Sequence, residues 1–183
     1  VAGRLVAEDR SPCLAAQAPY TAPELATGDG TEAFYRYDAP GPEATGLRDQ
    51  AGQPVLIEPR YFIGRVASVS SLTTQTVPSY DAAGRVLASA RRLAPPGPPK
   101  RALSERFTPR WYVQRQALDV LGRPLTSTTG VPASELLGKD GTSELRFSYT
   151  KRGGVRQLDS SYGLLLAETV SHADGRVNYT RLG

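Results

Sequence analysis

Most of this chain consists of short runs in which apolar and polar residues alternate, separated by glycine, proline and aspartate. The clearest is 144–149, where Leu145, Phe147 and Tyr149 alternate with charged and hydroxyl side chains. A period of two places the apolar set on the inward face of a β-strand and the polar set toward water. Such runs predict strands at 34–37, 55–57, 61–69, 73–80, 86–92, 111–118, 124–129, 144–149, 155–158, 164–170 and 177–182.

The succession of these runs predicts an all-β fold, an antiparallel meander of β-hairpins. It leaves open whether the meander is a curved sheet, a barrel or a sandwich. Helical structure is expected to be limited to one or two short turns. Residues 132–138 predict one of them, because proline suits a first helical position and glycine a helix end.

One turn motif recurs between the predicted strands, and residues 80–85 hold its fullest copy. The Asp81 carboxylate can accept hydrogen bonds from the backbone two residues on, and Gly84 can take the positive φ of the reversal. Arg85 then starts the return strand with its stem packed along the sheet. We therefore predict that Gly84→Val harms folding and that Arg85→Ala does little. The residues assigned to this structural turn motif are Gly3, Arg4, Asp49, Gly52, Tyr80, Asp81, Gly84, Arg85, Asp119, Gly122, Arg123, Asp174, Gly175 and Arg176.

On these motifs the chain resembles the RHS or YD-repeat family, which includes B and C components of bacterial toxin complexes. The stretches that carry the resemblance are 80–86, 119–125, 2–5 and 174–177, with 35–41 as a weaker match. The resemblance implies a β-sheet ribbon that spirals into a hollow shell, which encloses a toxic or effector polypeptide or presents a surface for adhesion.

The chain departs from the family pattern in two places. Leu118 replaces the tyrosine before Asp119, and Ala173 stands where the last motif would have its spacer. The chain is also too short to close a shell alone. It is therefore either one piece of a shell or a free-standing β domain that borrows the turn.

The length predicts a single β domain, 1–183. The run Pro95-Pro96-Gly97-Pro98-Pro99 cannot donate to a β-ladder and prefers an extended conformation. We interpret this run, 95–99, as a surface loop; the alternative is a linker between sub-lobes 1–94 and 101–183. The start at Val1, in the middle of a motif, predicts that the chain was cut from something longer.

Composition narrows the classes of site. The single Cys13 excludes an internal disulfide and a multi-cysteine metal site, and we expect it to be buried. No apolar run reaches the length of a membrane span, and no signal peptide is visible. A net charge of +4 permits an anionic ligand. The candidate binding residues, basic and aromatic in turn, are Arg106, Arg110, Trp111 and Tyr112.

The alternative for that set is solvated loop charges beside aromatic residues of the core. Trp111 and Tyr112 are also expected on opposite faces of one strand. Catalytic chemistry has one candidate, because His172 is the sole histidine and lies beside Asp174 in a predicted turn. We interpret it as an exposed turn residue and assign no catalytic residue, cofactor or metal.

Three functions remain in view. The first is a non-enzymatic structural or binding β module of a secreted bacterial RHS protein, whose partners are further segments of the same polypeptide or complex. The second is a free-standing secreted or periplasmic β-barrel or sandwich that binds a small ligand or glycan in a pocket of tyrosine and tryptophan. The third is a toxin or hydrolase domain that uses His172 or a pair of carboxylates in a cleft.

Overall fold

The residues that the structure describes form one open β-sheet. The computed structural model describes residues 3–9, 22–44, 46–48, 52, 54–55, 59–98, 100, 102–131, 133–139, 141 and 143–183. These residues form an 11-stranded sheet in which the strands follow one another in chain order from β1 to β11, each antiparallel to its neighbours. Because β1 and β11 are the two ends of this order, the sheet is not closed. The all-β meander is confirmed as a curved open sheet, and the barrel alternative is wrong.

The elements are short, as the spacing of glycine and proline predicts. The strands are β1 (Ala7–Glu8), β2 (Ala33–Tyr37), β3 (Val66–Ser70), β4 (Thr74–Tyr80), β5 (Val86–Leu93), β6 (Tyr112–Leu118), β7 (Pro124–Thr128), β8 (Glu144–Tyr149), β9 (Val155–Ser160), β10 (Gly163–Ser171) and β11 (Val177–Leu182). The 3-10 helices are η1 (Pro42–Ala44), η2 (Pro59–Phe62), η3 (Leu103–Glu105) and η4 (Ser134–Leu136).

Two strand predictions differ from the structure. The run 61–69 begins in η2 and a turn, and only its second part is strand β3. A strand at 55–57 is not formed by its described part, since Pro54 makes an isolated bridge with Arg48 and 56–57 lie outside the described residues. Val55 and Phe62, the buried apolar residues of these two segments, pack within the fold without belonging to a strand.

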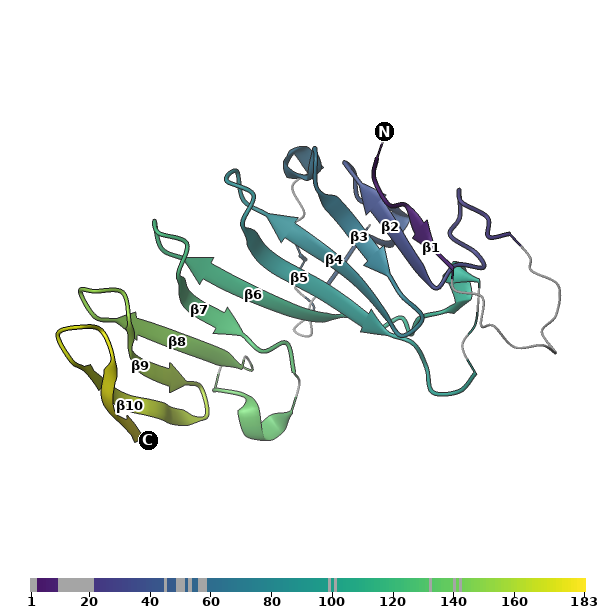
Figure 1. Ribbon diagram of the computed structural model, residues 1–183. Helices are drawn as coiled ribbons and strands as arrows, with labels where there is room; N and C mark the ends of the chain where they lie inside the picture. The colour runs from purple at the N-terminus through teal and green to yellow at the C-terminus, as the bar shows by residue number, and fades with distance from the viewer. Residues whose placement is uncertain are drawn as a thin grey trace, which may run out of the picture.

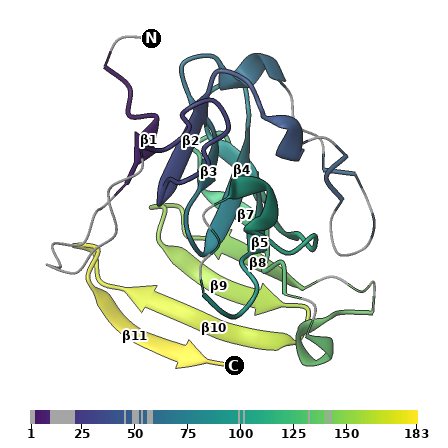
Figure 2. The same ribbon diagram turned by 90° about the vertical axis from the view of Figure 1, so that its right-hand side faces the viewer.

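The arrangement of the strands gives the sheet two distinct long sides. Figure 1 shows the hairpin turns β4–β5, β6–β7 and β8–β9 following one another along one side, while longer connections leave from the other. Seen from the side in Figure 2, the sheet curves, so that β10 and β11 sweep away from β2 and β3. The proline-rich run lies in the connection between β5 and β6, which pair directly. The division into sub-lobes stays a prediction.

A small core lies under the segment that connects β2 to β3. Leu47 and Val55 from that segment are buried against Val77, Ala90 and Val113, which come from β4, β5 and β6. The aliphatic contacts hold the connecting segment on one face of the sheet. No helix of the described residues is both long and apolar enough to cross a membrane.

Candidate functional site

The hairpin turns share one backbone geometry. In the β4–β5 turn the Gly84 amide donates to the Asp81 carbonyl, and the Asp81 amide donates to the Arg85 carbonyl, both at 2.9 Å. Gly84 has φ +82°, which L side chains adopt only with strain. This is a three-residue hairpin loop closed by a glycine bulge, a common connection between antiparallel strands.

The aspartate that opens the turn is held by the arginine that ends it. Asp81 accepts hydrogen bonds from the Arg85 amide at 2.9 Å and from the Arg85 guanidinium at 2.7 Å. The bond from the backbone of Arg85, with the ion pair added, lowers the pKa of the Asp81 carboxyl. Asp119 accepts the same two hydrogen bonds from Arg123, at the same two distances. The bond from the Arg123 amide in the same way lowers the pKa of the Asp119 carboxyl.

The β10–β11 turn uses the same backbone with a different residue in first place. The His172 amide donates to the Arg176 carbonyl, and the Gly175 amide donates to the His172 carbonyl. His172 therefore occupies the position of Asp81, and Asp174 lies two residues later. Asp174 still accepts from the Arg176 amide and guanidinium, and the guanidinium chiefly lowers its pKa.

A split copy of the motif joins β2 to β3. The Asp38 carboxylate accepts from the Gly64 amide at 2.7 Å, and the Asp38 amide donates to the Arg65 carbonyl at 3.1 Å. The Gly64 amide chiefly lowers the pKa of Asp38. Residues 39–63 are thus an insertion within one turn of the series, and they include Leu47 and Val55 of the core.

A β-bulge adjoins each of these turns, with its extra residue on the strand that follows the turn, opposite the last residues of the incoming strand. Tyr80 pairs with Val86 directly after a shift in register, and Tyr149 pairs with Val155 in the same way. Corresponding shifts occur at Tyr37, Leu118 and Ser171. Bulges commonly re-aim a side chain in this manner.

The redirected tyrosines contact the preceding hairpin in one repeated geometry. The Arg65 guanidinium lies 5.7 Å from the centre of the Tyr80 ring, and the Tyr80 hydroxyl donates to the Val66 carbonyl at 2.9 Å. The Arg123 guanidinium lies 4.4 Å from the centre of the Tyr149 ring, and the Tyr149 hydroxyl donates to the Pro124 carbonyl at 2.7 Å. Each tyrosine ring therefore contacts an arginine, and its hydroxyl donates to the carbonyl of the residue that follows that arginine.

The third copy of this contact lies at the N-terminal end of the sheet. Arg4 lies 5.1 Å from the Tyr37 ring, and Tyr37 donates to the Leu5 carbonyl at 2.9 Å. Arg4 also forms an ion pair with Asp38 at 2.8 Å. The half motif at Gly3 and Arg4 is thus the arginine side of a contact whose tyrosine side is in the next hairpin.

Where the next hairpin lacks a tyrosine, the arginine bonds to its backbone instead. Arg85 donates to the Asp119 carbonyl at 3.2 Å, beside Leu118. The β8–β9 turn has Gly154 where the other turns have arginine, and Arg152 from within that turn donates to the Ala173 carbonyl of the β10–β11 turn at 2.6 Å. We call the contacts made by Arg4, Arg65, Arg85, Arg123 and Arg152 to the following turn the turn ladder. It joins the successive hairpins along one side of the sheet.

The motif residues have a second role that the sequence reasoning did not assign. Arg85 and Arg123 were expected to pack along the sheet, yet they clamp the turn aspartate and reach the next hairpin. The four-residue spacing from Asp81 to Arg85, repeated from Asp119 to Arg123, was the available signal for the clamp. Gly64, Arg65 and Tyr149 were missed, because their motif copies are split or lack the aspartate.

The other predicted motif residues have the following places. Gly3, Gly52 and Gly122 have positive φ. The Arg48 guanidinium donates to the Gly52 carbonyl at 2.7 Å. Asp49 and Cys13 lie outside the described residues. The role of these residues in folding stays a prediction.

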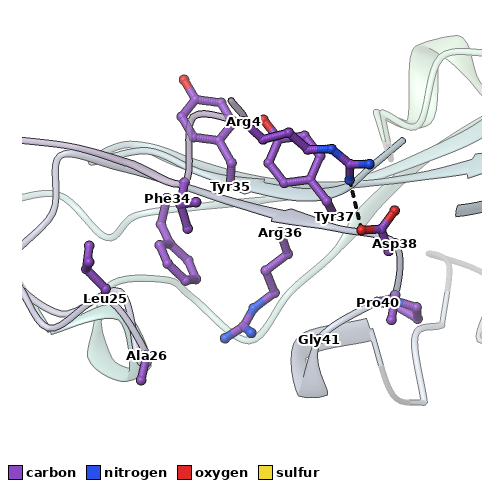
Figure 3. A pocket seen from close by; sticks show the side chains of 12 residues that line it. Arg4, Leu25, Ala26, Phe34, Tyr35, Arg36, Tyr37, Asp38, Pro40 and Gly41 are labelled. Atoms are coloured by element: carbon purple, nitrogen blue, oxygen red, sulfur yellow. Dashed lines mark hydrogen bonds and ion pairs between the residues drawn. The ribbon is translucent and has the colours of Figure 1, made fainter. Parts of the chain in front are cut away.

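A hollow of about 460 Å³ lies beside β2 at the N-terminal end of the ladder. Figure 3 shows Tyr35 and Tyr37 on one side of the strand, near Arg4, and Phe34 and Arg36 on the other. Leu25 and Ala26 complete its wall on the Phe34 side. This hollow contains two tyrosines, whereas the predicted ligand pocket combined tyrosine with Trp111, which lies elsewhere.

The predicted basic and aromatic set is divided between the interior and two faces of the sheet. Arg106 is 1% exposed and donates to the carbonyls of Thr31, Ser71 and Lys100, so it ties three loops together. Such a buried guanidinium supports the fold rather than meeting a ligand.

The remaining members of that set do not converge on one groove. Trp111 packs against the core and lies 4.9 Å below the Arg92 guanidinium. Tyr112 faces the other side of β6, where Arg110 lies 5.3 Å from its ring. An anionic ligand at this surface stays a prediction. Within the described residues no cluster of histidine, cysteine, aspartate and glutamate could hold a metal ion.

Comparison with solved structures finds the same fold in bacterial toxin complexes. The chain is similar to part of a crystal structure of TcdB2-TccC3-Cdc42, with a TM-score of 0.59 and 13% identity. It is likewise similar to part of the Tc holotoxin pore of Photorhabdus luminescens with a mutated TccC3, with a TM-score of 0.58 and 12% identity.

Each of these similarities covers 83% of this chain. The chain spans only 7% and 6% of the respective toxin chains. At this level of identity the similarity shows a common β-sheet architecture. No family model and no curated protein matches the sequence.

Proposed function

We propose that this chain is a non-enzymatic structural module, one segment of the β-ribbon that forms the wall of a secreted bacterial RHS-type shell. In this proposal residues 1–183 act as one unit. Neighbouring segments of the same polypeptide or complex pair with its edge strands. The finished wall encloses a toxic polypeptide or mediates a surface interaction.

The observation that carries the proposal is the open sheet with its strands in chain order. Such a sheet can be lengthened at either end without changing what is already built, because each strand pairs only with its neighbours in the order. An open edge also presents unpaired backbone groups that need a partner. The similarity to small parts of two toxin-complex structures supports the same use of the fold.

The turn ladder supports the proposal from a second direction. Its contacts repeat from hairpin to hairpin, and they bind each motif arginine to its own turn or to the next one. His172, the candidate of the hydrolase hypothesis, takes the first position of a hairpin turn. Asp174 beside it is bound by Arg176. The residues that recur along the sheet are thus accounted for by architecture.

The test is to express the chain together with the coding sequence that flanks it in its gene. Hydrogen exchange at β1 and β11 is then compared with the same amides in residues 1–183 alone. We expect both terminal strands to exchange much more slowly in the longer protein, and electron microscopy to show a hollow particle. Equal exchange in both proteins, or a gene without further repeat coding on either side, would contradict the proposal.

A further inference from the structure

The last strand, β11, has an open edge with an arginine at its start. The residues of β11 from Val177 to Leu182 are all exposed, and Val177 and Leu182 are 61% and 74% exposed. At the turn before it, the Arg176 side chain is 85% exposed, against 38% for Arg85 and 32% for Arg123. The difference is that Arg85 and Arg123 are each covered by a following hairpin.

Arg176 and Val177 repeat the dipeptide that receives a tyrosine elsewhere. In each complete contact an arginine lies over the ring, and the next residue's carbonyl accepts from the hydroxyl: Leu5, Val66 and Pro124 provide these carbonyls. Arg176 is already oriented by two bonds to Asp174, as Arg123 is by Asp119. The arginine side of a further contact is therefore preformed.

We propose that the Arg176–Val177 end of β11 is a docking site for a β-strand that runs antiparallel to β11 and ends in a tyrosine. The ring lies under the Arg176 guanidinium, and the tyrosine hydroxyl donates to the Val177 carbonyl. Cation–π and hydrogen-bond contributions then add to strand pairing. This inference rests on the proposed function and specifies the chemistry of one edge.

The residues of the two free edge strands argue against a second copy of this chain as the occupant. The free strand β1 (Ala7–Glu8) ends in Glu8, so the β1 edge of another copy has no tyrosine to place under Arg176. Two β11 strands paired about a two-fold axis would place Arg176 near Leu182 of the partner rather than near a tyrosine. The incoming strand must run in the direction of the even-numbered strands, such as β4 and β8, which end in Tyr80 and Tyr149.

The chain itself contains a suitable probe. Residues 71–93 form the β4–β5 hairpin with its preceding connection, and Tyr80 in it docks on Arg65 and Val66. A second copy of 71–93 is fused after Gly183, so that β11 takes the place of β3. Hydrogen exchange of the β11 amides is measured in the fusion and in the unfused chain.

We expect the appended hairpin to slow β11 exchange by about tenfold or more, the size of a cation–π contact and a hydrogen bond combined. Arg176→Gln, or leucine in place of the appended copy's tyrosine, should remove most of that protection. Arg181→Gln is the matched control, because it removes an exposed arginine from the same strand. It should leave the protection unchanged.

Three outcomes would overturn the inference. Equal protection with and without Arg176 would mean that strands add to β11 without tyrosine docking, and the proposed function would stand. Absence of protection in every fusion would remove the edge as a docking site altogether. Concentration-dependent protection in the unfused chain would identify a second copy as the occupant.

Discussion

The two ends of the sheet are built with the same turns, but connecting segments pack over the N-terminal strands and leave the C-terminal strands exposed. The buried apolar side chains among the described residues lie between Phe34 and Val113. The strands β9, β10 and β11 contain no buried residue. The turns therefore set the order of the strands throughout, whereas the covering segments decide where the stability lies.

The difference has a specific origin in the connections. The insertion 39–63 in the β2–β3 turn brings Leu47 and Val55 onto the sheet, and Arg106 ties the loops around 31, 71 and 100. The tight turns β8–β9 and β10–β11 bring no such cover. We expect the N-terminal part to unfold cooperatively and the C-terminal hairpins to open locally.

The largest contrast is expected from truncating one phenylalanine in each part. Phe62 is fully buried, with its ring 5.6 Å from that of Tyr80 in an edge-to-face contact. Phe62→Ala should lower the free energy of unfolding by about 3–5 kcal/mol. Phe147→Ala, the matched change in half-buried β8, should cost less than about 2 kcal/mol. Urea unfolding measures both, and equal losses would contradict the division into covered and open parts.

Replacing a turn glycine by valine should lower global stability in the N-terminal part of the sheet and only loosen the local hairpin in the C-terminal part. Gly84 and Gly175 have φ of +82° and +89°, so either substitution strains the backbone by about 2 kcal/mol. A Cβ at Gly84 would also come within 2.5 Å of the Arg65 guanidinium, whereas Gly175 has open space.

Gly84→Val should therefore lower the midpoint of thermal unfolding. Gly175→Val should leave that midpoint in place and only accelerate hydrogen exchange in β10 and β11. The reverse pattern would show that the C-terminal hairpin is part of the cooperative unit.

A missing tyrosine can be restored to the ladder. Leu118 pairs with Pro124 after a bulge, as Tyr80 pairs with Val86, and Arg85 approaches the same turn. Leu118→Tyr should place a ring under Arg85 and raise the free energy of unfolding by about 0.5–1 kcal/mol. Leu118→Phe supplies the ring without the hydroxyl. The difference between the two variants therefore measures the hydrogen bond that the tyrosine hydroxyl would donate to the Val86 carbonyl. A loss of stability in both variants would mean that the site cannot accept a ring.

The smallest effects concern pH. The bonds from Arg85 lower the pKa of Asp81, so the stability they provide is present above the ordinary pKa of 3.8 and is lost as the pH falls through the folded value. Asp81→Asn should thus destabilise the protein at pH 6, and the difference from the native chain should close as the pH falls through the lowered pKa of the folded state. Asp174→Asn should show little of this in global unfolding, because its turn opens locally. A difference that persists at low pH would assign the effect to packing.

Much of the fold could be predicted from local pattern. Alternation in 144–149 and glycine with arginine after each reversal indicate strands and turns directly, because both depend on residues close in sequence. The end of the run 61–69 that became η2 could not be predicted in this way. It belongs to the insertion 39–63, where Phe62 is buried while Ile63 is exposed, and Phe62 meets Tyr80 only in the folded chain.

The turn ladder lay beyond the sequence pattern for the same reason. Tyr80 and Arg65 belong to different hairpins, and nothing local indicates that a bulge turns the ring toward the preceding strand. Arg106 shows the opposite failure. A basic residue near aromatics suggested a binding surface, yet its charge is satisfied inside by three carbonyls.

The central claim is that an arginine of one turn and a tyrosine of the next hold neighbouring hairpins together. A double-mutant cycle on Arg123 and Tyr149, 4.4 Å apart, measures this directly, because it cancels the separate loss of the Asp119 ion pair. Unfolding free energies are compared for Arg123→Gln, Tyr149→Leu and the double variant. We predict a coupling energy of about 1 kcal/mol in favour of the pair. Additive losses within about 0.3 kcal/mol would contradict the account.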